Sequence, residues 1–193
     1  MTLAQIEEET LRALVSAGVR ARYYQAHPLD FKPKIAEAAI GDLSVGWVIY
    51  GKPGRGKTHL AAGIMRAHIL SGKARRPIFR MAREILRRIR ETNGSLAQER
   101  ESDVLADLCG ASLLVVDELG RESTAAKDDG PVSEFVLGAL HEMISRRLDD
   151  LKPTIFTTNL DDAEIESRYG GAVMSRLTEL QPLMLQGPDR RGG

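Results

Sequence analysis

Residues 51–58 read Gly-Lys-Pro-Gly-Arg-Gly-Lys-Thr, and they are the strongest indication of the fold in this chain. It matches the phosphate-binding pattern G-x-x-x-x-G-K-[ST] without a mismatch. The apolar run at 46–50 predicts a strand before it, and the run at 59–68 predicts a helix after it. In that setting, backbone N–H groups and the helix dipole point at phosphate oxygens. The flanking elements disfavour the alternative, a glycine-rich turn that binds nothing.

Two side chains of this loop have expected roles in binding ATP together with Mg²⁺. Lys57 can reach the β- and γ-phosphates, which also makes it a catalytic candidate, and the Thr58 hydroxyl can coordinate the metal. The expected nucleotide contacts in this region are Gly51, Lys52, Pro53, Gly54, Arg55, Gly56, Lys57, Thr58 and His59.

A second motif is Leu-Leu-Val-Val-Asp-Glu at 113–118, an apolar strand that ends in two carboxylates. A buried strand of a parallel sheet delivers its last residues to the carboxyl edge, where the phosphate-binding loop also lies. We therefore expect Asp117 to hold the Mg²⁺ shell and Glu118 to act on water as general base. The alternative is a strand followed by an ordinary polar turn.

Two later positions complete the predicted catalytic site. A strand at 153–158 leads to Asn159, which we expect beside the γ-phosphate, where it can orient the attacking water. Arg176 is a candidate arginine finger that acts in trans and offsets the charge developing on a neighbour's γ-phosphate. For Arg168 we favour a surface salt bridge, and Arg147 is a weaker candidate for contact between subunits.

Strands and helices alternate along the rest of the chain. Strands are predicted at 46–50, 77–80, 112–117, 153–158 and 181–185, and helices at 57–71, 81–92, 99–109, 131–149 and about 161–177. Pro131 suits the first position of its helix. A further helix at 2–17 begins with a capping box of Thr2 and Gln5. Short buried strands that alternate with helices predict an α/β fold with a parallel sheet covered on both faces.

Composition excludes several classes of protein. Acidic and basic residues balance at 27 each, so the net charge gives no argument for nucleic acid or membrane. The single cysteine excludes an internal disulfide. No apolar run is long enough to cross a bilayer, and the acidic N-terminus does not resemble a signal peptide. We expect a cytoplasmic protein whose 193 residues form one main domain without membrane contact.

Basic residues gather in one part of this neutral chain. Eight lie between Lys73 and Arg90, against one acidic residue, Glu84. Such a cluster on a helix can track the phosphates of nucleic acid, and the other interpretation is a solvated helix face. Because Phe79 is the one aromatic residue nearby, stacking on bases is expected to be minor. The candidate DNA contacts, at helical spacing, are Arg80, Arg83, Arg87 and Arg90.

In this order, the motifs resemble the DnaC/IstB-type AAA+ ATPases, which include bacterial and phage replicative helicase loaders. The matching stretches are Gly-Lys-Thr-His-Leu-Ala (56–61), Leu-Leu-Val-Val-Asp-Glu-Leu-Gly (113–120), Lys-Pro-Thr-Ile-Phe-Thr-Thr-Asn-Leu (152–160) and Ser-Arg-Leu (175–177). The segment 17–23 resembles the family's approach to the nucleotide base. The resemblance therefore implies that Val19 and Tyr23 contact the base.

The resemblance also implies an architecture and partners. It implies a P-loop AAA+ core with a five-stranded parallel sheet and no lid domain, and it implies Mg-ATP as ligand. The implied partners are single-stranded DNA, a replicative hexameric helicase and other copies of the chain in a ring or spiral. The expected AAA+ domain covers 18–187, and the expected flexible tail covers 188–193. The helix at 1–17 is the candidate partner contact, although the family's loaders carry a larger helicase-binding domain there.

Three functions remain open at this point. The first is an ATP-driven loader of a helicase onto single-stranded DNA. The second is an IstB-like transposition helper that binds duplex DNA and a transposase. The third is a nucleotide-binding adaptor that switches shape without useful turnover. Glu118, Asn159 and Arg176 disfavour this function.

Overall fold

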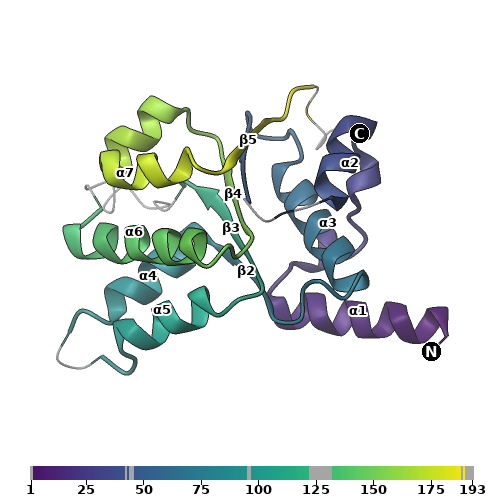
Figure 1. Cartoon of the computed structure of the whole chain (residues 1–193), viewed down its shortest axis with the longest axis horizontal. Coiled ribbons are helices and arrows are strands. Elements are labelled where there is room, and N and C mark those ends of the chain that lie inside the picture. Colours follow the sequence, from purple (N-terminus) through teal and green to yellow (C-terminus); the bar gives the residue numbers. More distant parts are fainter. Residues whose placement is uncertain are drawn as a thin grey trace.

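A single five-stranded parallel sheet organises the molecule (Figure 1). The computed structural model describes residues 2–41, 43, 46–94, 97–121, 132–187 and 189. The strands are β1 Trp47–Tyr50, β2 Pro77–Met81, β3 Leu113–Leu119, β4 Thr154–Thr158 and β5 Gln181–Met184. They lie in the order β2-β3-β4-β1-β5, and every neighbouring pair is parallel. The predicted parallel α/β sheet is confirmed.

Helices cover both faces of the sheet, as the alternation predicts (Figure 1). One face packs against α1, α2 and α3, and the other packs against α4, α5, α6 and α7. The helices are α1 Leu3–Ala17, α2 Pro33–Ile40, α3 Lys57–Leu70, α4 Ala82–Glu91, α5 Glu101–Cys109, α6 Glu134–Asp149 and α7 Asp162–Leu177, with short 3₁₀ turns η1 Ala21–Tyr23 and η2 Pro28–Asp30.

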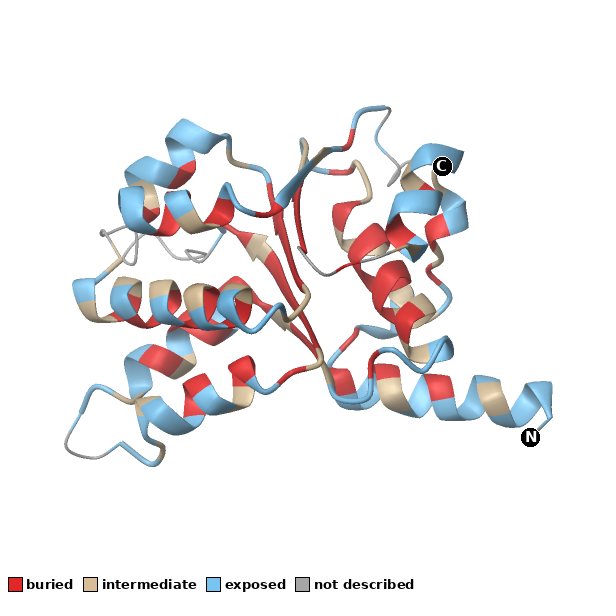
Figure 2. Cartoon of the chain, viewed as in Figure 1, coloured by how far each residue is buried: buried red, intermediate tan, exposed pale blue. Residues whose placement is uncertain are grey.

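The central strands are the most buried part of the chain (Figure 2). All five residues of β4 are buried, as are all residues of β3 except Glu118. A strand with helices on both faces has no solvated side, so an uninterrupted apolar run is its sequence pattern. By contrast, β5 lies at the sheet edge and accommodates Pro182, which would cost a ladder hydrogen bond in a central strand.

The N-terminal helix α1 forms as predicted. The Thr2 hydroxyl accepts a hydrogen bond from the backbone N–H of Gln5, and the Gln5 side chain accepts one from Thr2. Gly18 ends the helix with φ 95°, a left-handed conformation in which a side chain would be strained. Within the described ranges, no helix has both the length and the apolar character needed to span a bilayer.

The structure departs from the sequence expectations in three elements. Helix α2 forms at Pro33–Ile40, inside a segment for which no helix was predicted, because its proline occupies the first helical position and starts the helix. Helix α6 begins at Glu134, and the predicted start at Pro131 lies outside the described residues. Helix α7 is kinked at Gly170, which has φ 81°. Of the predicted tail, only Asp189 is described.

Candidate nucleotide-binding and catalytic site

The phosphate-binding loop connects β1 to α3 at the carboxyl edge of the sheet. Gly54 and Gly56 have φ values of 81° and 88°, which only glycine adopts without strain. Gly56 is also the N-cap of α3, so the backbone turns directly from the loop into the helix. The geometry is that of a loop whose N–H groups converge at a helix N-terminus, where an anion is favoured.

Lys57 is 8% exposed, and its amino group is held across the loop. The Nζ donates to the carbonyl oxygens of Gly51, at 2.5 Å, and Lys52, at 3.1 Å. It also donates to Oδ1 of Asn159, at 2.6 Å, at the end of β4. Two predicted site residues that are 102 positions apart in sequence are thus brought into direct contact.

Asp117 is 1% exposed, and its carboxylate is surrounded by hydroxyl groups. Thr58 donates to its two oxygens at 2.9 and 3.2 Å, and Thr157 donates to Oδ1 at 2.6 Å. Burial raises the pKa of Asp117, and the hydrogen bonds from Thr157 and Thr58 reverse only part of that effect. A buried carboxylate next to a hydroxyl provides the hard oxygen ligands that Mg²⁺ prefers.

These two oxygen ligands fit a metal that shares its coordination with a nucleotide. Within the described residues, no group of three His, Cys, Asp or Glu side chains lies close enough to hold a metal ion. Mg²⁺ is commonly bound through one or two protein oxygens, substrate phosphates and water, so Thr58 and Asp117 suffice on the protein side.

Glu118 stands at an irregularity in β3 that turns its side chain away from the strand pattern. Its φ is 60°, and the pairing of β3 with β4 shifts register between Val116 and Leu119. A bulge of this kind redirects one side chain beside a functional site. Three hydrogen bonds hold the bulge: the N–H of Glu118 donates to the Thr157 hydroxyl at 2.9 Å, the Thr158 hydroxyl donates to the Leu119 carbonyl at 2.9 Å, and the N–H of Gly120 donates to the Tyr169 hydroxyl at 2.8 Å.

A cavity opens at this edge of the sheet, and most of the predicted site lines it. The predicted residues that line it are Tyr23, Pro53, Gly54, Gly56, Lys57, Thr58, His59, Glu118 and Asn159. Gly51, Lys52 and Arg55 belong to the same loop, but they are not part of this lining. Val19 does not reach the cavity, because it is buried at 4% exposure in the core cluster that α1 and α3 share.

The lining also includes residues that the sequence analysis did not single out. Thr157 and Thr158 end β4, and their hydroxyls bond to Asp117 and to the backbone of β3. Their position at the polar end of an apolar strand was the available signal. Arg121 also lines the cavity, and its guanidinium lies 3.3 Å from the Glu118 carboxylate. No sequence pattern marked Arg121, since it is a lone basic residue after the carboxylate motif.

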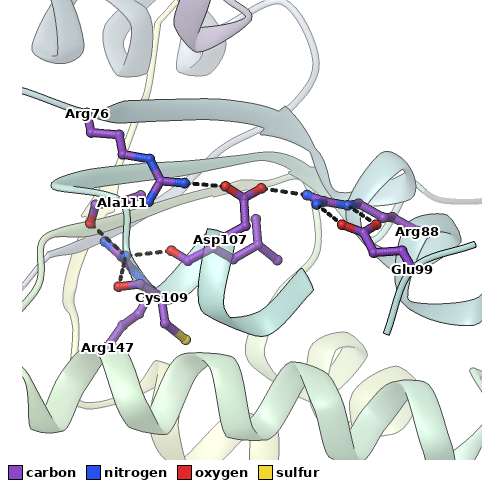
Figure 3. Close-up of polar contacts among 8 residues, drawn as sticks. Arg76, Arg88, Glu99, Asp107, Cys109, Ala111 and Arg147 are labelled. Carbon is purple, nitrogen blue, oxygen red and sulfur yellow. Dashed lines mark hydrogen bonds and ion pairs between the residues drawn. The ribbon is translucent and has the colours of Figure 1, made fainter. Parts of the chain in front are cut away.

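The other predicted arginines lie elsewhere. Arg176 is in the last turn of α7, pairs with Glu179 at 2.9 Å and does not line the cavity of its own chain. Arg147 was wrongly considered a contact between subunits, because it is 0% exposed. Its guanidinium donates to the carbonyl oxygens of Leu108, Cys109, Ala111 and Pro153 and to the Thr154 hydroxyl, which fixes the end of α5 to the start of β4 (Figure 3).

The basic segment contains two kinds of arginine. Arg80 lies in β2, within the strand predicted at 77–80, and not on α4 with the other candidate DNA contacts. Its guanidinium donates to the carbonyl oxygens of Ala17 and Phe79 at 2.6 and 2.8 Å. Arg76 and Arg88 both pair with Asp107, and Arg88 also pairs with Glu99 (Figure 3). The arginines exposed on the outer face of α4 are Arg83, Arg87 and Arg90.

The chain is similar in sequence to a known replication protein. No family model matches the chain. The replicative helicase loader DnaC of Escherichia coli K12 is 29% identical over 155 residues, which cover 79% of this chain and 58% of that protein. This chain therefore matches less than two thirds of the length of that relative.

Solved structures share the fold. The crystal structure of the DnaC helicase loader has a TM-score of 0.66 at 23% identity, covering 86% of this chain and 100% of that chain. The replication initiator DnaA bound to AMPPCP and single-stranded DNA has a TM-score of 0.67 at 16% identity, covering 90% of this chain and 53% of that chain. The predicted resemblance is confirmed: this chain is similar to the DnaC-type replicative helicase loaders and has their AAA+ P-loop fold.

Proposed function

We propose that the protein is an ATPase that loads a replicative helicase onto single-stranded DNA. The observation that carries the proposal is the convergence of Lys57, Asn159, Thr58 and Asp117 at one edge of the sheet, with Glu118 beside them. The similarity to DnaC supports the replication role. The AMPPCP bound by the structurally similar DnaA supports a nucleoside triphosphate as ligand.

The proposed reaction divides the catalytic tasks among a few side chains. The backbone of the loop and Lys57 bind the phosphates, and Asn159 orients a water molecule. The water oxygen forms a bond to the γ-phosphorus, the bond to the β,γ-bridging oxygen breaks, and Glu118 accepts the proton of the water. The products are ADP and inorganic phosphate. Mg²⁺ held by Thr58 and Asp117 would neutralise charge on the β- and γ-oxygens.

Arg176 is the proposed finger for a neighbouring subunit. It does not line the cavity of its own chain, and its side chain is about one third exposed, at 35%. A cation in that position can complete the site of a second copy in a ring or spiral, where it would offset charge in the transition state.

The proposed DNA surface is the outer face of α4. Ile85, Leu86 and Ile89 are buried on its inner face, whereas the three exposed arginines point outward from the core. Such a surface binds backbone phosphates without reading sequence. We further propose that residues 18–187 form the ATPase unit and that α1, which ends before it, contacts the helicase.

The central assignment is tested by calorimetry with Mg-ATP. Lys57→Ala removes a hydrogen-bonded charge, which is worth about 1.5–3 kcal/mol and hence about 10- to 150-fold in affinity. The control Lys34→Ala removes an exposed lysine from α2, outside the site, and should bind as the wild type does. Unchanged affinity in Lys57→Ala would disprove the assignment of the phosphate site.

The partner is tested by capture from the native host with the wild-type protein and with Lys57→Ala. Nucleotide-dependent recovery of a replicative helicase supports the proposed role. Recovery of a transposase, together with tighter binding of duplex DNA than of single strands, would favour the transposition helper instead.

A further inference from the structure

The segment 19–31, called the approach segment below, packs against α3, the helix that follows the phosphate-binding loop, and Arg20 at its start reaches Met81 of β2. Its two 3₁₀ turns, η1 and η2, both contact α3. Tyr23, at the end of η1, lines the nucleotide cavity together with His59 of α3. The position of Tyr23 at the cavity therefore depends on how the approach segment is attached to α3.

One attachment is a direct contact of backbone with helix at Gly63. A Cβ built at Gly63 would lie 2.9 Å from the carbonyl carbon of His27 and 3.1 Å from its Cα and its N. All three atoms belong to the backbone, so a rotamer change in the approach segment cannot relieve the contact. Any side chain at Gly63 would push the approach segment away from α3.

The second attachment is the pair formed by His59 and Asp30. The His59 Nε2 lies 2.6 Å from Oδ2 of Asp30, and the same carboxylate accepts the backbone N–H of His27 at 2.9 Å. Burial raises the pKa of Asp30, but the hydrogen bonds from His59 and His27 outweigh it and leave that pKa below its usual value. The ionised carboxylate thus joins the turn of η2 to α3.

The attachment also orders aromatic rings at the cavity. The His59 ring lies edge-to-face with Tyr23, at 6.2 Å between centroids, and tilted against Phe31, at 5.9 Å. Aromatic pairs in such arrangements have a preferred geometry, so fixing His59 also fixes Tyr23. The phosphate half of the site is held separately, by the loop backbone and Lys57.

We propose that the Gly63 contact and the His59–Asp30 pair form a latch that holds Tyr23 against the nucleoside half of a bound nucleotide. The latch sets the affinity for base and ribose and leaves the affinity for the phosphates unchanged. Gly63 and Asp30 act through His59 and Tyr23, which line the cavity, and are therefore positioning residues. This inference rests on the proposed nucleotide site.

The test compares Mg-ATP with Mg-tripolyphosphate, which lacks the nucleoside, by calorimetry on the full chain. Gly63→Ala should weaken ATP binding about fivefold or more, the usual effect of a forced overlap, and leave tripolyphosphate binding unchanged. The matched control is Gly138→Ala in α6, where an added Cβ meets no atom within 4 Å. Both changes replace a helical glycine, so the comparison removes the general effect of helix propensity.

Asp30→Asn gives a second test if Gly63→Ala does not fold. Both side chains of the pair are partly exposed, so we expect a loss of about two- to fivefold for ATP and none for tripolyphosphate. Asp150→Asn, which removes an exposed pair with Lys152, is its control and should change neither ligand. In a Tyr23→Ala background, Asp30→Asn should have no further effect on ATP.

The outcomes separate the latch from the proposed function. If the wild-type protein binds ATP and Asp30→Asn binds it equally well, the latch is overturned and the nucleotide site stands. Equal losses for ATP and tripolyphosphate would also overturn it, because the variants would then disturb the phosphate loop. A wild-type protein that binds neither ligand would overturn both proposals.

Discussion

The charged residues at the carboxyl edge of the sheet have their partners within the same site, whereas several residues of the basic segment 73–90 have partners in other parts of the chain. At the sheet edge, Lys57 and Asp117 are buried, and each is held by several oxygen atoms of the same site. In the basic segment, Arg76, Arg80 and Arg88 have partners outside the segment, in α1, α5 and the loop before α5.

This difference shows what a motif determines and what a cluster of charge does not. A loop that joins a strand to a helix fixes its side chains relative to the sheet, so spacing along the chain predicts their place. A cluster of arginines has no such constraint, because each guanidinium can form an ion pair or hydrogen bond with any acidic side chain or carbonyl oxygen nearby. Three of the eight basic residues are paired with other parts of the chain in this way, although Arg76 stays exposed.

The largest expected effect tests whether the proposed catalytic site at the sheet edge needs a residue from a second chain. Arg176→Ala should still bind ATP, but its turnover should fall by about 10³ or more, as for loss of an arginine finger. Mixing it with Lys57→Ala subunits should restore part of the activity, because each subunit then supplies what the other lacks. ATPase assays of the separate and mixed proteins check this, and full activity of Arg176→Ala alone would contradict it.

The next effect tests the bulge that presents Glu118. Glu118→Gln keeps the shape of the side chain but removes the base, so turnover should fall by about 10²–10⁴. ATP affinity should stay close to that of the wild type, since Lys57 and Asp117 are unchanged. Calorimetry and single-turnover hydrolysis measure the two properties separately. Turnover near the wild-type rate would mean that Glu118 is only a turn residue.

A third prediction concerns an arginine that is fully withdrawn from the surface. Arg147→Ala leaves four carbonyl oxygens and a hydroxyl without their donor in the core, as well as a cavity. We expect the free energy of unfolding to fall by ~3–5 kcal/mol. Urea denaturation measures it, with Arg146→Ala, an exposed neighbour paired with Glu142, as control. A small loss for Arg147→Ala would remove its assigned structural role.

The smallest effect tests the outer face of α4. If Arg83, Arg87 and Arg90 each neutralise one phosphate, the logarithm of affinity for single strands should fall with the logarithm of salt at a slope of about −2. Replacing all three with Ala should flatten this slope in fluorescence anisotropy. Removing the same charge from other surfaces, at Arg12, Lys34 and Arg146, should not. An unchanged slope in the first variant would identify α4 as a solvated face.

The sequence was sufficient to predict the five strands and the convergence of the motif residues at one edge of the sheet. Buried parallel strands are continuous apolar runs, and helices are periodic, so the alternation along the chain predicted the sheet. The ends of β1, β3 and β4 meet at one edge in any sheet of this kind, which brings Lys57, Asp117 and Asn159 together. Helix α2 was missed because prolines such as Pro28 and Pro33 occur both in turns and at helix starts.

Which polar groups are partners depends on how the elements pack against one another. Three of these contacts join elements that are distant in sequence. Arg147 is buried in the core, Arg80 lies against the end of α1, and Asp30 reaches His59. Local patterns set the shape of each segment through backbone geometry and the burial of apolar side chains. A charged side chain instead bonds to the groups that the packing of those segments brings within hydrogen-bond distance, and the local sequence does not predict which groups these are.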